Sequence, residues 1–317
     1  MRYDIVTMGA PLVEVMRKEL DRPFCEPADF SGPYPSGDTP IFIGAAARLG
    51  ASCCFIGVVG DDDFGRCVVN RLRADGVDVS CIRVAPGRTT AVTFVSYFSD
   101  GSRKFIYHCT HAAAGLLGPG DIDPERFRDI GWLHVTGFAL AGSPSAERAV
   151  HKALGLISDR VRVSFDPNIR PEILSVEQIR KLCAPVLERA CLVLPSAGEA
   201  AMLTGEPDDE RGCRRLQEGG RLVVRKNGSR GCTVYGEEGR VKVPGFPVRE
   251  VDPTGAGDCF AAAFITGLNE GMLPEEAARF ANAVGAMSVR ARGPMEGAPW
   301  RREVEGFMLR HAGAAGG

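Results

Sequence analysis

Short apolar runs suited to buried strands alternate with segments of helical periodicity over most of this chain. The apolar runs are DIVTMG, CCFIGVVG, WLHVTG, VRVSFDPN, CLVLPS and RLVVRKNG. The helical segments between them include PIFIGAAARLG, FGRCVVNRLRADG, SAERAVHKALGLI, SVEQIRKLCAPVLERA and LPEEAARFANAVGAMSV. Strands that are apolar on both faces and separated by helices form mostly parallel sheets with helices on both sides. The sequence therefore predicts an α/β protein with a mostly parallel central sheet.

Two regions interrupt this alternation. Residues 11–38 contain five prolines and no clear helical pattern. Residues 88–112 have two apolar arms around the turn SDGS, and Asp-Gly is a strong hairpin signal. We expect these two segments to form a small β-sheet that acts as a lid on a single domain of residues 1–312. Residues 313–317 are expected to be a flexible tail.

Composition excludes several classes of protein. The formal net charge of −2 argues against a nucleic-acid-binding protein, which needs a basic surface. No apolar run reaches the roughly 18 residues of a membrane helix, and the N-terminus lacks the apolar region of a signal peptide. The 11 cysteines are scattered and include no CxxC pair, which favours reduced thiols and a cytoplasmic protein.

The segment EVDPTGAGDCFAAAF, residues 250–264, combines a glycine-rich turn with the start of a helix. Apolar positions after Gly257 fall on one helical face, so the helix should begin at 256–258. Gly255 and Gly257 allow a ligand to approach the backbone, and the first helical N–H groups form an anion site. Asp258 then lies in the first turn. From the residues alone it is either an acid that stabilises the helix dipole or a base that accepts a proton from an attacking hydroxyl.

Two motifs resemble the signatures of the ribokinase (PfkB) family of sugar kinases. DPTGAGDCF is similar to the family's C-terminal signature, and residues 49–80, with the core GVVGDDDFG, resemble its N-terminal signature. The order of the motifs and the strand–helix pattern agree over about residues 3–300. The resemblance implies a ribokinase-like α/β/α fold with a β-sheet lid. It also implies a cytoplasmic enzyme that transfers the γ-phosphoryl group of ATP to a sugar hydroxyl with Mg²⁺.

The resemblance also implies roles for the glycine-rich turn. Asp258 would be the general base, and the backbone of Gly255, Ala256 and Gly257 would form an anion hole for the transferring phosphoryl group. Asp252 and Thr254 match positions that hold a monovalent cation such as K⁺ beside that hole. The alternative for these two residues is capping of the turn.

The nucleotide side is implied by three further segments. LPSAGEAAMLTG resembles the N-x-x-E motif, with Glu199 retained to hold Mg²⁺ through water and Ser196 in place of the asparagine. An ordinary first-turn glutamate is the alternative there. The positions that match the phosphate and adenine regions of the family are Lys226, Gly228, Gly231, Asn282 and Gly285. For Asn282 a helix-surface position is the alternative.

The sugar side departs further from the family. Glu14, Gly37 and Asp38 match substrate-binding positions, whereas Ile41 replaces the usual asparagine. SFDPNIRPEIL resembles 2-keto-3-deoxygluconate kinases and fructokinases, and nominates Asp166, Asn168 and Arg170 as substrate ligands. Arg170 could grip a carboxylate with two hydrogen bonds. In the lid, His108 stands where the keto-acid kinases have an arginine. A zinc site in HCTH is disfavoured, because a strand would direct Cys109 and His111 away from His108.

The sequence leaves the acceptor open. Arg170 favours a sugar acid such as 2-keto-3-deoxygluconate, whereas Glu14 and Asp38 favour a neutral, fructose-like sugar. A ribose- or nucleoside-type kinase and a catalytically weak sugar-binding sensor are the alternatives. A nicotinamide oxidoreductase is a poorer rival because the first strand lacks GxGxxG. We expect a homodimer through the lid, since pairing would cover its strand edges.

Overall fold

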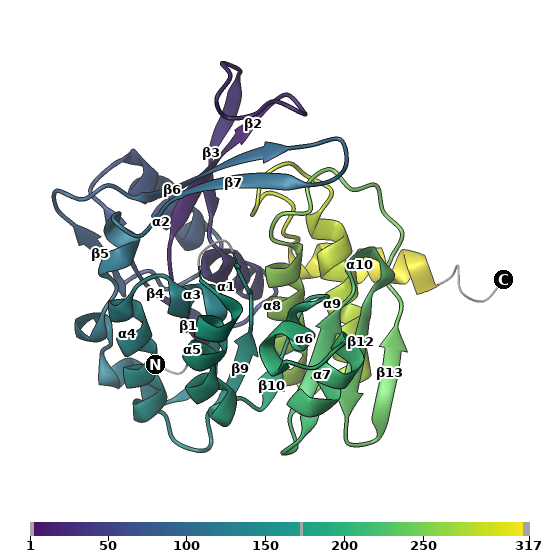
Figure 1. The fold of residues 1–317 in the computed structure, drawn as a ribbon. Coiled ribbons are helices and arrows are strands. Elements are labelled where there is room, and N and C mark those ends of the chain that lie inside the picture. The colour runs from purple at the N-terminus through teal and green to yellow at the C-terminus, as the bar shows by residue number, and fades with distance from the viewer. Residues whose placement is uncertain (1–2, 172–173, 313–317) are drawn as a thin grey trace.

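The computed structural model describes residues 3–171 and 174–312, and the expected tail, 313–317, lies outside them. Each of the six apolar runs contains a strand of one nine-stranded sheet (Figure 1). In spatial order the sheet consists of β13 (Gly239–Val243), β12 (Cys232–Gly236), β11 (Leu222–Lys226), β10 (Leu192–Val193), β9 (Arg162–Asp166), β8 (Ile130–Thr136), β1 (Tyr3–Met8), β4 (Cys53–Gly60) and β5 (Ile82–Ala85).

The pairing confirms the predicted mostly parallel sheet. From β11 to β5 every neighbouring pair of strands is parallel. Only β12 and β13 join antiparallel, as an edge hairpin that the sequence analysis did not predict. Parallel strands place their carboxyl ends on one edge of the sheet, which is where open α/β sheets bind ligands.

Helices cover both faces of the sheet, as the apolar runs require. One face packs against α1 (Asp38–Arg48), α2 (Asp63–Ala74), α8 (Ala256–Asn269), α9 (Pro274–Ser288) and α10 (Arg301–Ala312). The other packs against α3 (Gly137–Ala141), α4 (Pro144–Leu156), α5 (Val176–Arg189), α6 (Glu199–Thr204) and α7 (Asp209–Gln217). In β4, Phe55 belongs to the first core and Ile56 to the second, because successive side chains of a strand point to opposite faces.

A separate four-stranded sheet stands over the carboxyl edge of the main sheet (Figure 1). Its order is β3 (Phe30–Ser36), β2 (Leu12–Arg17), β6 (Ala91–Tyr97) and β7 (Arg103–His108). The pair β6–β7 is the predicted hairpin, and β2 lies parallel to β6. All four strands come from the two segments that interrupt the α/β alternation.

All 11 cysteines are free, and they range from fully buried to exposed Cys25 and Cys191. Within residues 3–171 and 174–312, no helix has the length and apolar character needed to cross a bilayer.

Candidate active site

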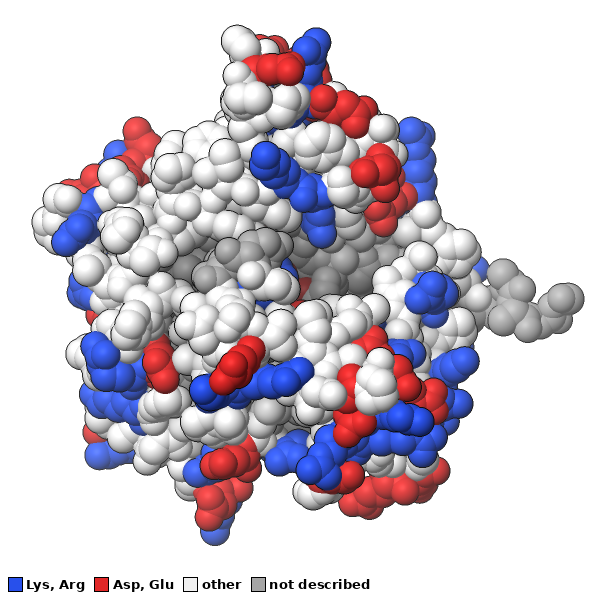
Figure 2. Space-filling view, viewed as in Figure 1, with Lys and Arg blue, Asp and Glu red and all other residues white. Residues whose placement is uncertain are grey.

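A pocket of about 490 Å³ lies between the carboxyl edge of the main sheet and the second sheet. The molecular surface is hollowed at this place in Figure 2. The pocket brings together most of the side chains that the sequence analysis singled out. Those that line it are Glu14, Gly37, Asp38, Asp166, Asn168, Arg170, Ser196, Glu199, Lys226, Thr254, Gly255, Gly257 and Asp258.

The start of α8 forms the floor of the pocket. Gly255 is the N-cap with φ 81°, and a Cβ there would lie 2.5 Å from the carbonyl oxygen of Pro294. Only glycine fits this left-handed, crowded position without strain. The helix therefore begins where the sequence predicts, and its first amides face the pocket without intrahelical acceptors. Ala256 itself does not line the pocket, and its N–H donates to the carbonyl oxygen of Pro253 at 3.3 Å.

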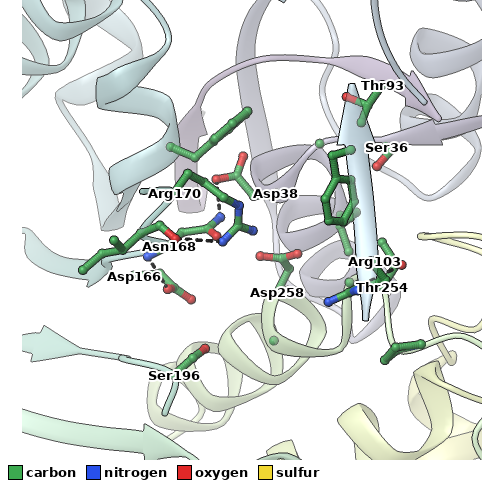
Figure 3. A pocket seen from close by; sticks show the side chains of 18 of the residues that line it. Ser36, Asp38, Thr93, Arg103, Asp166, Asn168, Arg170, Ser196, Thr254 and Asp258 are labelled. Atoms are coloured by element: carbon green, nitrogen blue, oxygen red, sulfur yellow. Dashed lines mark hydrogen bonds between the residues drawn. The ribbon is translucent and has the colours of Figure 1, made fainter. Parts of the chain in front are cut away.

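Asp258 lies in the first turn of α8 with its carboxylate in the pocket, between Arg170 and Arg103 (Figure 3). Burial raises the pKa of Asp258 well above its ordinary range, and repulsion from Asp38 and Asp166 adds to this. The nearby positive charges act in the opposite direction. A carboxylate with a raised pKa holds an accepted proton more strongly than a surface aspartate does.

Lys226 and Asp166 form a buried ion pair beside the start of α8. Their Nζ and Oδ2 atoms are 2.5 Å apart, and their side chains are 10% and 4% exposed. Although burial lowers the pKa of Lys226, Asp166 and Glu199 raise it, so the ammonium group stays charged. A Cβ at Gly257 would lie 3.4 Å from Nζ, so the lysine reaches the amide end of α8.

Glu199 joins two loops at the carboxyl edge. One carboxylate oxygen accepts the N–H of Ser196 and the other accepts the N–H of Ile169, both at 2.7 Å. Burial raises the pKa of Glu199, and repulsion from Asp166 adds to the effect. The carboxylate is thus held in place by the backbone, and its remaining lone pairs are available to water or a ligand.

Asp38 and Asn168 meet at the carboxyl edge beside Asp166, whose carboxylate accepts the N–H of Asn168 at 3.2 Å. The Asn168 amide donates to an Asp38 oxygen at 2.8 Å, and the Thr39 N–H donates to the other oxygen at 2.7 Å. Asn168 has φ 39°, an uncommon conformation for a residue other than glycine. Arg170 follows in the same loop, and its guanidinium points toward Asp258 (Figure 3).

The roof of the pocket is the inner face of the second sheet. Glu14 is buried there and accepts a hydrogen bond from Ser36 Oγ at 2.7 Å, while its Oε2 has no partner among the described residues. Burial raises the pKa of Glu14 from 4.5 to about 7. Thr93 lies opposite Glu14 in the sheet register and also lines the pocket. The sequence analysis missed Thr93, because only the register shows which face it occupies.

Strand β7 corrects the predicted role of His108. Arg103, Phe105 and Tyr107 line the pocket, and side chains alternate along a strand. His108 therefore points to the opposite face, where its ring packs edge-on against Phe94 with centroids 6.0 Å apart. The sequence predicted a lid without an arginine toward the pocket, but Arg103 lines it.

Asp252 does not line the pocket; it fixes the loop that leads into α8. Its carboxylate accepts the hydroxyl of Tyr97 and the N–H of Thr254 on one oxygen, and the N–H of Gly293 on the other, at 3.1, 3.0 and 2.9 Å. Thr254 lines the pocket, and its Oγ1 lies 3.2 Å from the Tyr97 hydroxyl. These contacts favour the turn-capping alternative for Asp252.

The predicted adenine and phosphate positions outside the pocket have structural contacts. Asn282 is buried rather than on a helix surface, and its amide donates to the carbonyl oxygens of Val243 and Pro244, both at 3.1 Å. A Cβ at Gly231 would lie 2.4 Å from the backbone nitrogen of Gly245 and 2.6 Å from the carbonyl carbon of Pro244. The pocket lining includes neither of these residues, nor Gly228 or Gly285. Among the described residues, no group of three His, Cys, Asp or Glu side chains could hold a metal ion.

The chain resembles known proteins over nearly its whole length. A family model described as pfkB family carbohydrate kinase matches residues 43–301. The 2-dehydro-3-deoxygluconokinase of Thermoproteus tenax is 35% identical over 309 residues, which are 96% of this chain and 94% of that protein. Fructokinase-1 of Oryza sativa subsp. japonica is 31% identical over 83% of this chain and 85% of that protein.

A solved structure has the same fold. The E. coli protein described as a "putative Ribokinase II", in complex with ATP and Mg²⁺, superposes with a TM-score of 0.92 and 39% identity. The match covers 98% of this chain and 100% of that one. This similarity confirms the predicted ribokinase-like architecture, and the relatives named as sugar kinases confirm the predicted class of enzyme. The chain therefore belongs to the pfkB family of carbohydrate kinases, enzymes that phosphorylate sugars.

Proposed function

We propose that this enzyme transfers the γ-phosphoryl group of ATP to a hydroxyl of a sugar acid bound under the second sheet. The observation that carries the proposal is the position of Asp258, in the first turn of a helix whose start lines the pocket through Gly255 and Gly257. Asp258 takes the proton of the acceptor hydroxyl, whose oxygen forms a bond to the γ-phosphorus as the bond to the β-phosphate oxygen breaks. The amides of Gly255, Gly257 and Asp258 stabilise the charge on the phosphoryl oxygens.

The nucleotide side of the pocket suits ATP with Mg²⁺, which are bound in the similar E. coli structure. Lys226 offers a charged ammonium group beside the α8 amides. Glu199 and the neighbouring Ser196 would hold the magnesium ion through water, since both Glu199 oxygens already accept backbone N–H groups. Bound there, Mg²⁺ supplies positive charge to the ATP phosphates. We place the adenine beside 228–231 and 282–285, where Asn282 shapes the wall rather than contacting the base.

A K⁺ ion beside the anion hole is the proposed role of the loop that carries Asp252 and Thr254. The loop is held in place by Asp252, and its backbone carbonyl groups, including that of Thr254, are oxygen ligands of the kind that hard cations prefer. Comparison of turnover in K⁺ and in choline chloride at equal ionic strength tests this role. Equal turnover in both salts argues against it.

A sugar acid is the acceptor that the charges of the pocket favour. Arg170 lies in the pocket without an ion pair among the described residues, and its planar guanidinium matches a carboxylate. The 35% identity to a 2-dehydro-3-deoxygluconokinase supports the same class. Glu14, Asp38 and Thr93 supply oxygens for the hydroxyls of the acceptor.

A neutral ketose is the second candidate, and one observation favours it. The roof carries an unpartnered Glu14 oxygen, which suits a sugar hydroxyl but repels a carboxylate. The relative named fructokinase-1 agrees with this alternative. A ribose- or nucleoside-type acceptor and a non-catalytic sensor remain the outcomes that the activity test must separate.

The second sheet would act as a lid that excludes water from the reaction. Its outer face exposes Phe30 and Ile106, which are 38% and 39% exposed. We propose that this face pairs with a second copy in a homodimer, because apolar strand edges favour such pairing. Sedimentation at micromolar concentration that gives the monomer mass would contradict the dimer. The free cysteines support a location in the reducing cytoplasm.

A screen for ADP release tests the proposed function. The purified enzyme is assayed with ATP, Mg²⁺ and K⁺ against sugar acids, ketoses, aldoses and nucleosides, and the product is identified by ³¹P NMR. We expect the highest kcat/KM with a 2-keto-3-deoxy sugar acid. A higher kcat/KM with a neutral ketose would show that the acceptor is a ketose and not a sugar acid. Tight sugar binding without any phosphorylated product would favour the sensor.

A further inference from the structure

Arg103 is an arginine of the second sheet that the predicted site did not include. It is the first residue of β7, and it lines the pocket together with Phe105 and Tyr107. Its Cζ lies 5.6 Å from the centre of the Phe105 ring, so the guanidinium is within cation–π distance of that ring. Arg103 thus reaches down from the roof toward the floor of the pocket.

The guanidinium of Arg103 ends at the loop that starts α8. Its Nη1 donates to Thr254 Oγ1 at 3.3 Å, and Thr254 directly precedes the N-cap Gly255. In Figure 3, Arg103 and Arg170 flank Asp258 from opposite sides. The two arginines therefore come from different parts of the molecule, one from the roof and one from the carboxyl edge, and meet over the same helix start.

The Arg103 guanidinium has more N–H donors than its contact with Thr254 uses. A guanidinium carries five N–H donors, and the Thr254 hydroxyl takes one of them. Arg103 forms no ion pair with any carboxylate of residues 3–171 and 174–312. An exposed arginine that lies over a helix N-terminus without an acidic partner is placed to meet an anion that arrives there.

The charge balance of the pocket favours such a partner for phosphoryl transfer. Five carboxylates line the pocket, those of Glu14, Asp38, Asp166, Glu199 and Asp258, against the three cations Arg103, Arg170 and Lys226. Lys226 is already paired with Asp166. A phosphoryl group that carries negative charge would be repelled unless a free cation stands beside the α8 amides.

We propose that Arg103 contacts the transferring phosphoryl group and stabilises its charge in the transition state, so that the second sheet contributes a catalytic residue. The inference rests on the proposed function and extends it. The guanidinium donates two hydrogen bonds to the phosphoryl oxygens while the acceptor oxygen bonds to phosphorus and ADP departs. Because Arg103 belongs to the roof, this contact couples closure over the sugar to the chemical step.

The first test is the kinetics of Arg103→Gln, with Lys104→Gln as the matched control. Lys104 is the next residue of β7, is exposed and does not line the pocket, so its substitution removes the same charge from the other face. We expect Arg103→Gln to lower kcat by about 10²–10³-fold with both a sugar acid and a neutral ketose. Lys104→Gln should leave kcat unchanged. Arg103→Lys should recover part of the loss, because it keeps the charge but not the planar fork.

The second test does not depend on turnover. The affinity of the enzyme for ADP alone and for ADP with aluminium fluoride, which mimics the transferring phosphoryl group, is measured by calorimetry in the presence of Mg²⁺. We expect Arg103→Gln to lose at least about tenfold more affinity for the ADP–aluminium fluoride complex than for ADP. Thermal unfolding confirms that the variant is folded.

Three results would overturn the proposal. Arg103→Gln could match Lys104→Gln in every measurement, which would make Arg103 a surface charge. It could raise KM for the sugar acid alone, which would assign Arg103 to the acceptor's carboxylate. It could weaken ADP and the aluminium fluoride complex equally, which would assign it to the nucleotide. Absence of wild-type turnover with every acceptor would refute the proposed function, while the calorimetry would still test Arg103.

Discussion

The protonation of Glu14 should link the stability of the enzyme to pH. Its carboxylate is 6% exposed, accepts one hydrogen bond from Ser36 and leaves Oε2 without a partner in the described chain. Burial raises its pKa from 4.5 to about 7, with repulsion from Asp252 as a further cause and the Ser36 hydrogen bond opposing. The perturbation that tests this is Glu14→Gln, which keeps the shape and removes the titration.

The direction of the effect follows from proton binding. The folded state holds the Glu14 proton more tightly than the unfolded state, so its contribution to stability is complete below pH 4.5. That contribution is lost as the pH rises from 4.5 to about 7. A pKa that is raised from 4.5 in the unfolded state to about 7 in the folded state changes the free energy of unfolding by roughly 3 kcal/mol. Glu14→Gln should therefore be more stable than the wild type at pH 8 and should lose this advantage toward pH 5.

Urea unfolding of the sugar-free enzyme between pH 5 and 8 measures the effect, with Glu19→Gln as the control at an exposed acid of the same segment. A sugar hydroxyl that donates to Glu14 favours its charged form, so sugar binding near pH 6.5 should release up to about one proton. Calorimetry in buffers of different ionisation enthalpy detects that release. Stability curves of the wild type and Glu14→Gln that run parallel over this pH range would refute the reasoning.

Two further substitutions test the floor of the pocket. Gly255→Ala should lower stability by about 1–3 kcal/mol and reduce kcat, because φ is 81° and a Cβ would meet Pro294. Gly155→Ala, at an exposed position of α4 with open space around it, should instead raise stability by up to about 1 kcal/mol. Equal urea midpoints for the two variants would contradict this. Asp166→Ala should cost about 3–5 kcal/mol by leaving Lys226 charged and buried without its partner. The double variant Asp166→Ala/Lys226→Met removes the unpaired charge and should therefore be more stable than Asp166→Ala. A double variant that is no more stable than the single variant would count against a buried pair.

Local patterns predicted the parts of the fold that local chemistry dictates. The six strands were predictable because each is a continuous apolar run, and the start of α8 because the glycines and the apolar face agree. The edge strand β13 was missed because four of its five residues are exposed and polarity alternates with no apolar run. The edge of a sheet needs less burial, and its sequence therefore carries a weaker signal.

The second sheet contributes site residues that could not be predicted from the sequence. Which of Arg103 and His108 faces the pocket depends on the strand register across β6 and β7, and a shift of one residue would exchange them. The ion pair between Asp166 and Lys226 is likewise invisible in sequence, because it forms only when β9 and β11 flank β10. The motifs identified the reaction, whereas the contacts of the acceptor depend on packing between distant segments.

The most direct test of the central claim compares the wild type with Asp258→Asn in one assay that measures ADP and sugar phosphate together. The substitution keeps the size of the side chain at the start of α8 and removes its ability to accept a proton. We expect equimolar ADP and sugar phosphate from the wild type. For Asp258→Asn we expect kcat to fall by roughly 10³-fold or more, whereas the free energy of unfolding and the affinity for ADP stay unchanged. Near-normal turnover by Asp258→Asn would contradict the assignment of this pocket as a phosphoryl-transfer site.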